Sequence, residues 1–89
     1  MITAADVQTK LKREPFVPFR IVTSSGKAYD VHHPEWAMVF RRYIEVGLLN
    51  PEFPDFPDMS EWVSMLHITA LEDIPPSVAS KHKSNGKKK

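Results

Sequence analysis

The segment of this sequence richest in metal-ligand types is His32-His33-Pro34-Glu35. Imidazole and carboxylate groups bind divalent metals, and His67 is a further candidate ligand. Neighbouring side chains of a strand point to opposite faces, so His32 and His33 bind one ion only if Pro34 bends the chain. The spacing matches no established zinc signature. The alternative, which we favour, is a kinked corner where a histidine hydrogen-bonds a loop carbonyl.

Residue patterns that carry out catalysis are scarce in this chain. The sequence has no cysteine, which excludes a disulfide framework, a thiolate nucleophile and a cysteine-based zinc or iron–sulfur site. It contains no Gly-rich phosphate loop and no Ser-His-Asp arrangement. Glu72 and Asp73 are neighbours in an expected strand, so their carboxylates face opposite ways. We therefore expect a protein that is not an enzyme and binds no cofactor.

The most regular segment is residues 51–59, which repeat the pattern proline, acid, apolar residue three times. The prolines favour polyproline II, which has three residues per turn. This period places Phe53, Phe56 and Met59 along one edge. One interpretation is that this edge closes an open side of the small β-barrel expected for this chain, either in its own chain or across a homo-oligomer. The other is that it docks on a neighbouring subunit or another protein. We favour closure, because a chain of 89 residues has a thin core that needs apolar cover.

Arginines and aromatic residues of the expected strands could together form a face for single-stranded nucleic acid, by ring stacking and phosphate contact. The candidates are Arg20, Arg41, Arg42, Tyr29, Trp36 and Tyr43. Arg41 and Arg42 are the better ones, because they lie at an expected hairpin tip beside Tyr43. The alternative is that these are solvated turn residues.

The formal net charge of +1 conceals an uneven distribution. All eleven acids precede residue 81, whereas five of the twelve basic residues follow residue 80, so residues 1–80 carry a net charge of −4. The tail lysines are Lys81, Lys83, Lys87, Lys88 and Lys89. We expect residues 77–89 to be disordered, either as a solubilising end or as an electrostatic tether to nucleic acid or an acidic partner. We expect the folded part to lack a general nucleic-acid surface.

Local signals predict one N-terminal helix followed by short strands. Thr3 and Asp6 have capping-box spacing, and Pro15 limits the helix to about residues 4–13. Apolar alternation and turn residues predict the other elements. Strands are expected over 19–23, 28–32, 36–40, 43–49, 60–68 and 71–74, with a loop over 50–59 and a break near 67–70. Residues 1–76 are thus expected to form a single small β-barrel, because closure removes exposed edges.

The order of these elements resembles the Sm-like small barrels, including the bacterial RNA chaperone Hfq. The stretch from Trp62 to Leu71 is similar to the final strand, histidine-containing turn and last strand of Hfq. The resemblance implies that residues 1–76 form an Sm/SH3-like β-barrel, and it allows several copies of the chain to assemble into a ring. Where the uridine site of Hfq has a Lys-His pair, this chain has Leu66-His67, so only His67 is carried over. Residues 15–74 also resemble short uncharacterised bacterial proteins with a PFRI, Gly-turn, V-x-HPE and HI…Glu pattern.

We therefore expect a non-enzymatic oligomerisation or protein-interaction module of bacterial type. An Sm-like RNA-binding protein and a metal-binding accessory domain are the alternatives. No apolar run is long enough to cross a bilayer and the N-terminus lacks a signal-peptide pattern, so a cytoplasmic protein without membrane association is expected.

Overall fold

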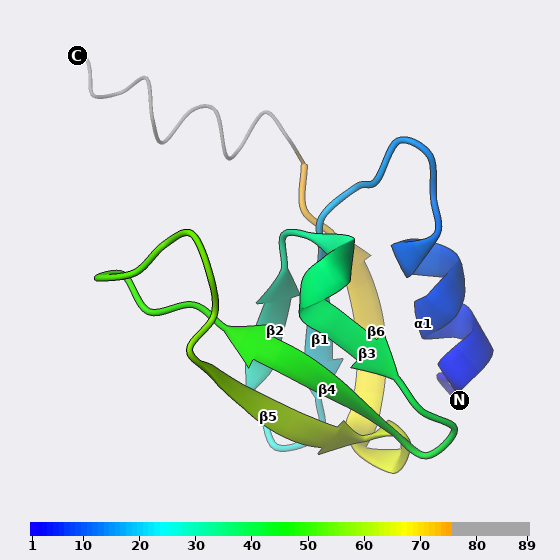
Figure 1. Ribbon diagram of the computed structural model, residues 1–89. Coiled ribbons are helices and arrows are strands. Elements are labelled where there is room, and N and C mark those ends of the chain that lie inside the picture. Colours follow the sequence, from blue (N-terminus) through cyan, green and yellow to red (C-terminus); the bar gives the residue numbers. More distant parts are fainter. Residues whose placement is uncertain (76–89) are drawn as a thin grey trace.

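The computed structural model describes residues 1–75, which form an N-terminal helix and six β-strands (Figure 1). The expected mainly β fold with an N-terminal helix is confirmed, and the predicted lysine tail lies outside the described residues. The elements are α1 (Ala4–Leu11), β1 (Phe19–Thr23), β2 (Ala28–Val31), the 3-10 helix η1 (Pro34–Trp36), β3 (Ala37–Val39), β4 (Tyr43–Leu48), β5 (Met59–Ser64), the 3-10 helix η2 (Met65–His67) and β6 (Ile68–Asp73).

The strands form two three-stranded antiparallel sheets, in the orders β2-β1-β6 and β3-β4-β5. The chain passes from one sheet to the other through η1 and η2. Each passage interrupts the backbone pairing, and no strand pairing within residues 1–75 joins the sheets. The predicted closed barrel is therefore wrong: the two sheets enclose one core, but they stay open to each other.

Both sheets contribute to a single core. Phe19 and Ile21 of β1 and Ile44 of β4 are completely buried, as is Val7 of α1. Buried and exposed side chains alternate along β1 and along most of β4, because successive side chains of a strand point to opposite faces of the sheet. The turn before β2 uses Gly26 at φ 92°, a backbone conformation that glycine adopts without strain. Most of the buried side chains thus come from strands that the alternation pattern identifies, and α1 and η2 add Val7 and Met65.

Side chains join the two sheets where main-chain pairing is absent. Tyr29 of β2 donates its hydroxyl to Glu61 of β5 at 2.9 Å, and Lys27 Nζ lies 3.0 Å from the same carboxylate. Hydrogen bonds from Lys27 and Tyr29 lower the pKa of Glu61, while burial raises the pKa of Tyr29. This contact ties β2 to β5 across the open side.

The helix α1 is held on the opposite side by a cluster of charges. Lys10 Nζ lies 2.8 Å from Asp73 Oδ1, and Arg13 donates from both terminal nitrogens to the same carboxylate. These hydrogen bonds lower the pKa of Asp73 well below its usual range. The capping box is confirmed, with Thr3 and Asp6 bonding each other's backbone nitrogens. The helix ends at Leu11, two residues earlier than predicted, and Arg13 also donates to the Val17 carbonyl.

The predicted strand over 60–68 is too long. β5 ends at Ser64, whose hydroxyl accepts a hydrogen bond from the Leu66 nitrogen and caps η2. The carbonyls of Arg42 and His67 accept from Met65 and Ser24, respectively. These long-range bonds fix the break at Met65–His67 and let β6 begin at Ile68, three residues before the prediction.

Candidate functional site

The acidic, proline-rich segment is an ordered loop built around Asn50. The Asn50 carbonyl accepts from the Phe53 nitrogen at 2.8 Å, and its side-chain oxygen accepts from the Glu52 nitrogen at 2.9 Å. Its amide nitrogen donates to Asp58 at 3.1 Å, which ties the start of the loop to its end. We name residues 50–58 the acidic loop. Its first residues turn rather than continue as polyproline II, so the predicted period of three does not extend through it.

Pro57 fixes the acidic loop to β4 through Gly47. A Cβ placed on Gly47 would lie 2.7 Å from Pro57 Cγ, 2.9 Å from Pro57 Cβ and 3.3 Å from the Trp36 carbonyl oxygen. Only glycine therefore allows the proline ring to approach this strand so closely. This contact was not predicted from the sequence, although a glycine inside an alternating strand was the signal for it.

The apolar residues of this segment point to solvent. Phe53 is 60% exposed, Phe56 73% and Met59 67%. The expectation that they fold onto the barrel of their own chain is therefore wrong. The core of residues 1–75 is built from Val7, Met65 and the inward faces of both sheets, without these three side chains. The alternatives that place these side chains against another molecule remain.

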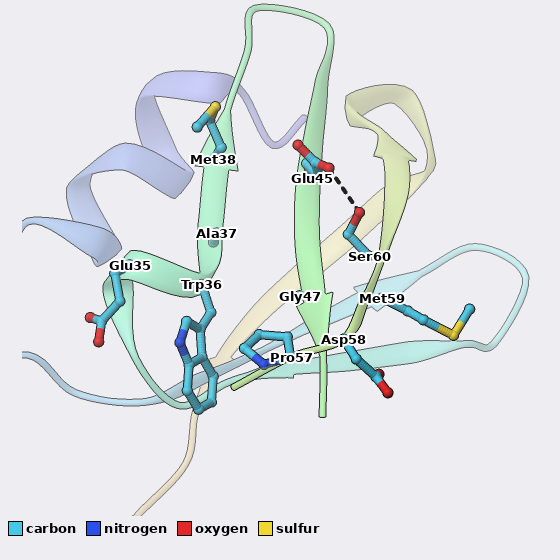
Figure 2. Close-up of a pocket in the computed structure, with 10 residues that line it drawn as sticks. All are labelled: Glu35, Trp36, Ala37, Met38, Glu45, Gly47, Pro57, Asp58, Met59 and Ser60. Carbon is cyan, nitrogen blue, oxygen red and sulfur yellow. Dashed lines mark hydrogen bonds between the residues drawn. The ribbon is translucent and has the colours of Figure 1, made fainter. Parts of the chain in front are cut away.

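A shallow hollow of about 370 Å³ lies between the acidic loop and the outer face of β3 and β4 (Figure 2). Gly47 and Ala37 lie along it, and Trp36, Met38 and Met59 add apolar surface. Three carboxylates also line it, from Glu35, Glu45 and Asp58. Glu45 accepts a hydrogen bond from Ser60 at 2.8 Å, drawn as the dashed line in Figure 2. The hollow is thus both apolar and acidic.

A row of stacked rings crosses the same outer face toward the β3–β4 hairpin. Phe40 and Tyr43 stack with centroids 4.6 Å apart, and Tyr43 and Trp62 stack at 5.0 Å. Trp62 is 66% exposed. Glu45 of β4 pairs with Met38 of β3 on one side and with Trp62 of β5 on the other, so the three residues lie in one row across the sheet. Trp62 was not predicted to be a surface residue. The signal was available, because Val63 points inward and its neighbour must then point outward.

The predicted basic-aromatic face is only partly assembled. Arg41 and Arg42 are exposed at the hairpin tip beside Tyr43, as expected. Tyr29 instead lies in the core, and Arg20 pairs with Asp30 at 2.7 Å on the other sheet. The predicted lysines of the tail lie outside the described residues.

The metal-ligand candidates lie in and beside the two 3-10 helices. His32 and His33 are exposed, and the His33 ring packs edge-on against Trp36 with centroids 4.3 Å apart. Glu35 lies in η1, whereas His67 ends η2. Within residues 1–75 no three histidine, aspartate or glutamate side chains come together as a metal-binding group.

No family model, curated protein or solved structure matches the chain significantly. Among the described residues, no helix has the length and apolar character needed to cross a membrane.

Proposed function

We propose that this chain is a non-enzymatic protein-interaction module that forms homo-oligomers. The observation that carries the proposal is the amount of large apolar side chain left in solvent on the acidic loop and on the sheet face beside it. Phe53, Phe56 and Met59 project from and beside the acidic loop, while Met38 and Trp62 lie on the adjoining sheet face. Scattered exposed apolar residues are ordinary, but a contiguous group of them is typical of an interaction site.

The rigidity of the acidic loop supports this proposal. Asn50 bonds both ends of the loop, and Pro57 is held against Gly47. A loop ordered in this way loses little conformational freedom when it binds, so more of its contact energy appears as affinity. Aromatic and methionine side chains are also the types enriched at the centres of protein interfaces.

A Phe53→Ser, Phe56→Ser double variant tests the proposal. Both rings are exposed, so we expect the variant to keep the circular dichroism spectrum and melting temperature of the native chain. Sedimentation velocity should show a native particle heavier than the 10.2 kDa chain and a variant shifted toward monomer. Loss of folding in the variant would instead show that the rings close the core, and an unchanged oligomer would remove the loop from the interface.

The second candidate function is binding of single-stranded nucleic acid by an Sm-like ring. The stacked rings of Phe40, Tyr43 and Trp62 beside Arg41 and Arg42 favour it, because bases stack on exposed aromatic side chains next to cations. The acidic excess over residues 1–80 argues against it.

Mobility shift of poly-U and poly-A at low salt, with and without residues 81–89, separates the two functions. A shift that persists without residues 81–89 and disappears in the Trp62→Ala variant supports a nucleic-acid face. A shift that depends on residues 81–89 alone shows only unspecific electrostatic binding.

A further inference from the structure

A second hollow, of about 430 Å³, lies at the opposite end of β4 from the acidic loop. Its walls come from Ile2 and Met65, with the exposed Met1 and Leu66 at its mouth. Its exposed lining is mostly apolar, and its volume falls in the range of about 300–1,000 Å³ typical of ligand pockets. We name it the hairpin hollow, because Arg41 and Arg42 of the β3–β4 hairpin complete its lining.

The charges of the hairpin hollow have no partners in residues 1–75. The salt bridges there use Lys10, Arg13, Arg20 and Lys27. Arg41 and Arg42 take part in none of them, although both guanidinium groups are exposed. An apolar hollow with two unpaired cations is suited to a ligand with an apolar group flanked by carboxylates.

The acidic loop has these properties. Phe53 and Phe56 project from it, and the carboxylates of Glu52 and Asp55 stand beside the two rings in sequence and form no salt bridge in the described residues. A phenyl ring buried in the hollow would bring an adjacent carboxylate toward an arginine at its mouth. Arginine binds carboxylates with directional, paired hydrogen bonds.

The loop cannot reach the hollow of its own chain. The hairpin tip precedes Tyr43 and the loop follows Leu48, so the six-residue strand β4 separates them (Figure 1). This spacing is about 17 Å at about 3.4 Å per residue. The bonds of Asn50 and the contact of Pro57 with Gly47 hold the loop at its own end. The complementary surfaces can therefore meet only between two molecules.

We propose that the acidic loop of one copy of this chain docks into the hairpin hollow of a second copy. This inference rests on the proposed oligomerisation and names the two surfaces that meet. Each copy carries both surfaces, so two copies that exchange loops form a closed dimer, whereas one-way docking gives a ring or an open chain.

Charge reversal on each side tests the contact. The variants are Arg41→Glu with Arg42→Glu on the hollow, and Glu52→Lys with Asp55→Lys on the loop. In each variant loop and hollow carry the same sign of charge, so we expect its self-association to weaken by at least about tenfold. In an equimolar mixture every loop again faces a hollow of opposite charge, and association should return. Lys12→Glu and Glu14→Lys, which are exposed and belong to neither surface, serve as controls for charge reversal elsewhere, at half the change in net charge of each double variant.

Sedimentation velocity of the native chain, each variant and the mixture gives the answer. Weakened variants with a restored mixture support the contact. Native-like association of either variant, or a mixture that stays monomeric while the native chain associates, overturns it and leaves the proposed oligomerisation standing. A native chain that is itself monomeric overturns both. Melting temperatures establish that the variants are folded.

Discussion

Gly47 determines how closely the acidic loop lies against β4. The Pro57 ring occupies the space where any other residue would place its Cβ, at 2.7 Å from Pro57 Cγ. Such a distance forces either the loop or the strand to move. The position of the loop thus depends on one hydrogen atom where every other residue type has a carbon.

Gly47→Ala is expected to destabilise the fold by about 1–3 kcal/mol, the usual cost of inserting a methyl group into a packed contact. Pro57→Ala should relieve part of this, because it removes the Cγ atom at 2.7 Å and frees the loop from the proline ring, although the Cβ at 2.9 Å stays. Urea unfolding of the two single variants and the double variant measures the coupling. Strict additivity of the two changes would contradict the contact between Gly47 and Pro57.

Among single residues, the arginines of the hairpin were easier to place from the sequence than the residues of the acidic loop. Arg41 and Arg42 were predicted at an exposed hairpin tip, where the structure places them. The loop phenylalanines were expected to cover the core and are instead exposed. The three hydrogen bonds of Asn50 and the packing of Pro57 were not predicted. They join residues whose distance in space depends on the turn between β4 and β5, which the composition of the loop does not specify.

Among the elements, the helix α1 has the most locally determined start. Thr3 Oγ1 accepts from the Asp6 nitrogen, and the Asp6 carboxylate accepts from the Thr3 nitrogen at 2.8 Å. These hydrogen bonds lower the pKa of Asp6. They involve only residues three apart, which is why the sequence predicts them.

Thr3→Ala is expected to cost about 0.5–2 kcal/mol, because it leaves a helix N–H without its acceptor. Thr9→Ala is the matched control. Thr9 is also an exposed threonine of this helix and donates only to the Ala5 carbonyl, so its loss should change stability by less than about 0.5 kcal/mol. Equal losses in the two variants would contradict the role of the capping box.

The junction between β5 and β6 shows why the boundaries of some elements were harder to predict. Ile68 looked like the end of one strand, because apolar residues recur from Trp62 to Leu66 with no glycine or proline among them. In the structure Ile68 begins β6, since the Met65 nitrogen of η2 donates to the Arg42 carbonyl and the His67 carbonyl accepts from the Ser24 nitrogen. A break fixed by tertiary hydrogen bonds leaves little trace in local periodicity. The break at η2 and the similar one at η1 lie where the chain passes between the two sheets, which do not close into the predicted barrel.

For the whole molecule, charge contacts connect the parts that backbone pairing leaves separate. Asp73 holds the helix to β6 through Lys10 and Arg13, and Glu61 holds β2 to β5. The pKa of each carboxylate is lower in the folded chain than its ordinary value of about 4, because donors stabilise the charged form. The unfolded chain therefore takes up protons first as the pH falls.

The stability from these carboxylates is fully present above a pH of about 4 and is lost as the pH falls toward the lowered pKa values. We expect the urea midpoint to be constant near neutral pH and to fall in acid. Asp73→Asn should lower the midpoint at neutral pH and flatten the acid branch, because it removes the group with the most strongly lowered pKa. An acid branch equally steep in this variant would assign the pH dependence to other groups.

We have proposed that the exposed apolar surface joins copies of the chain. The most direct measurement is the mass of the native protein by sedimentation equilibrium, from low micromolar to near-millimolar concentration. We predict a mass that rises above 10.2 kDa with concentration and approaches a multiple of it. A mass that stays at 10.2 kDa over the whole range would contradict the account.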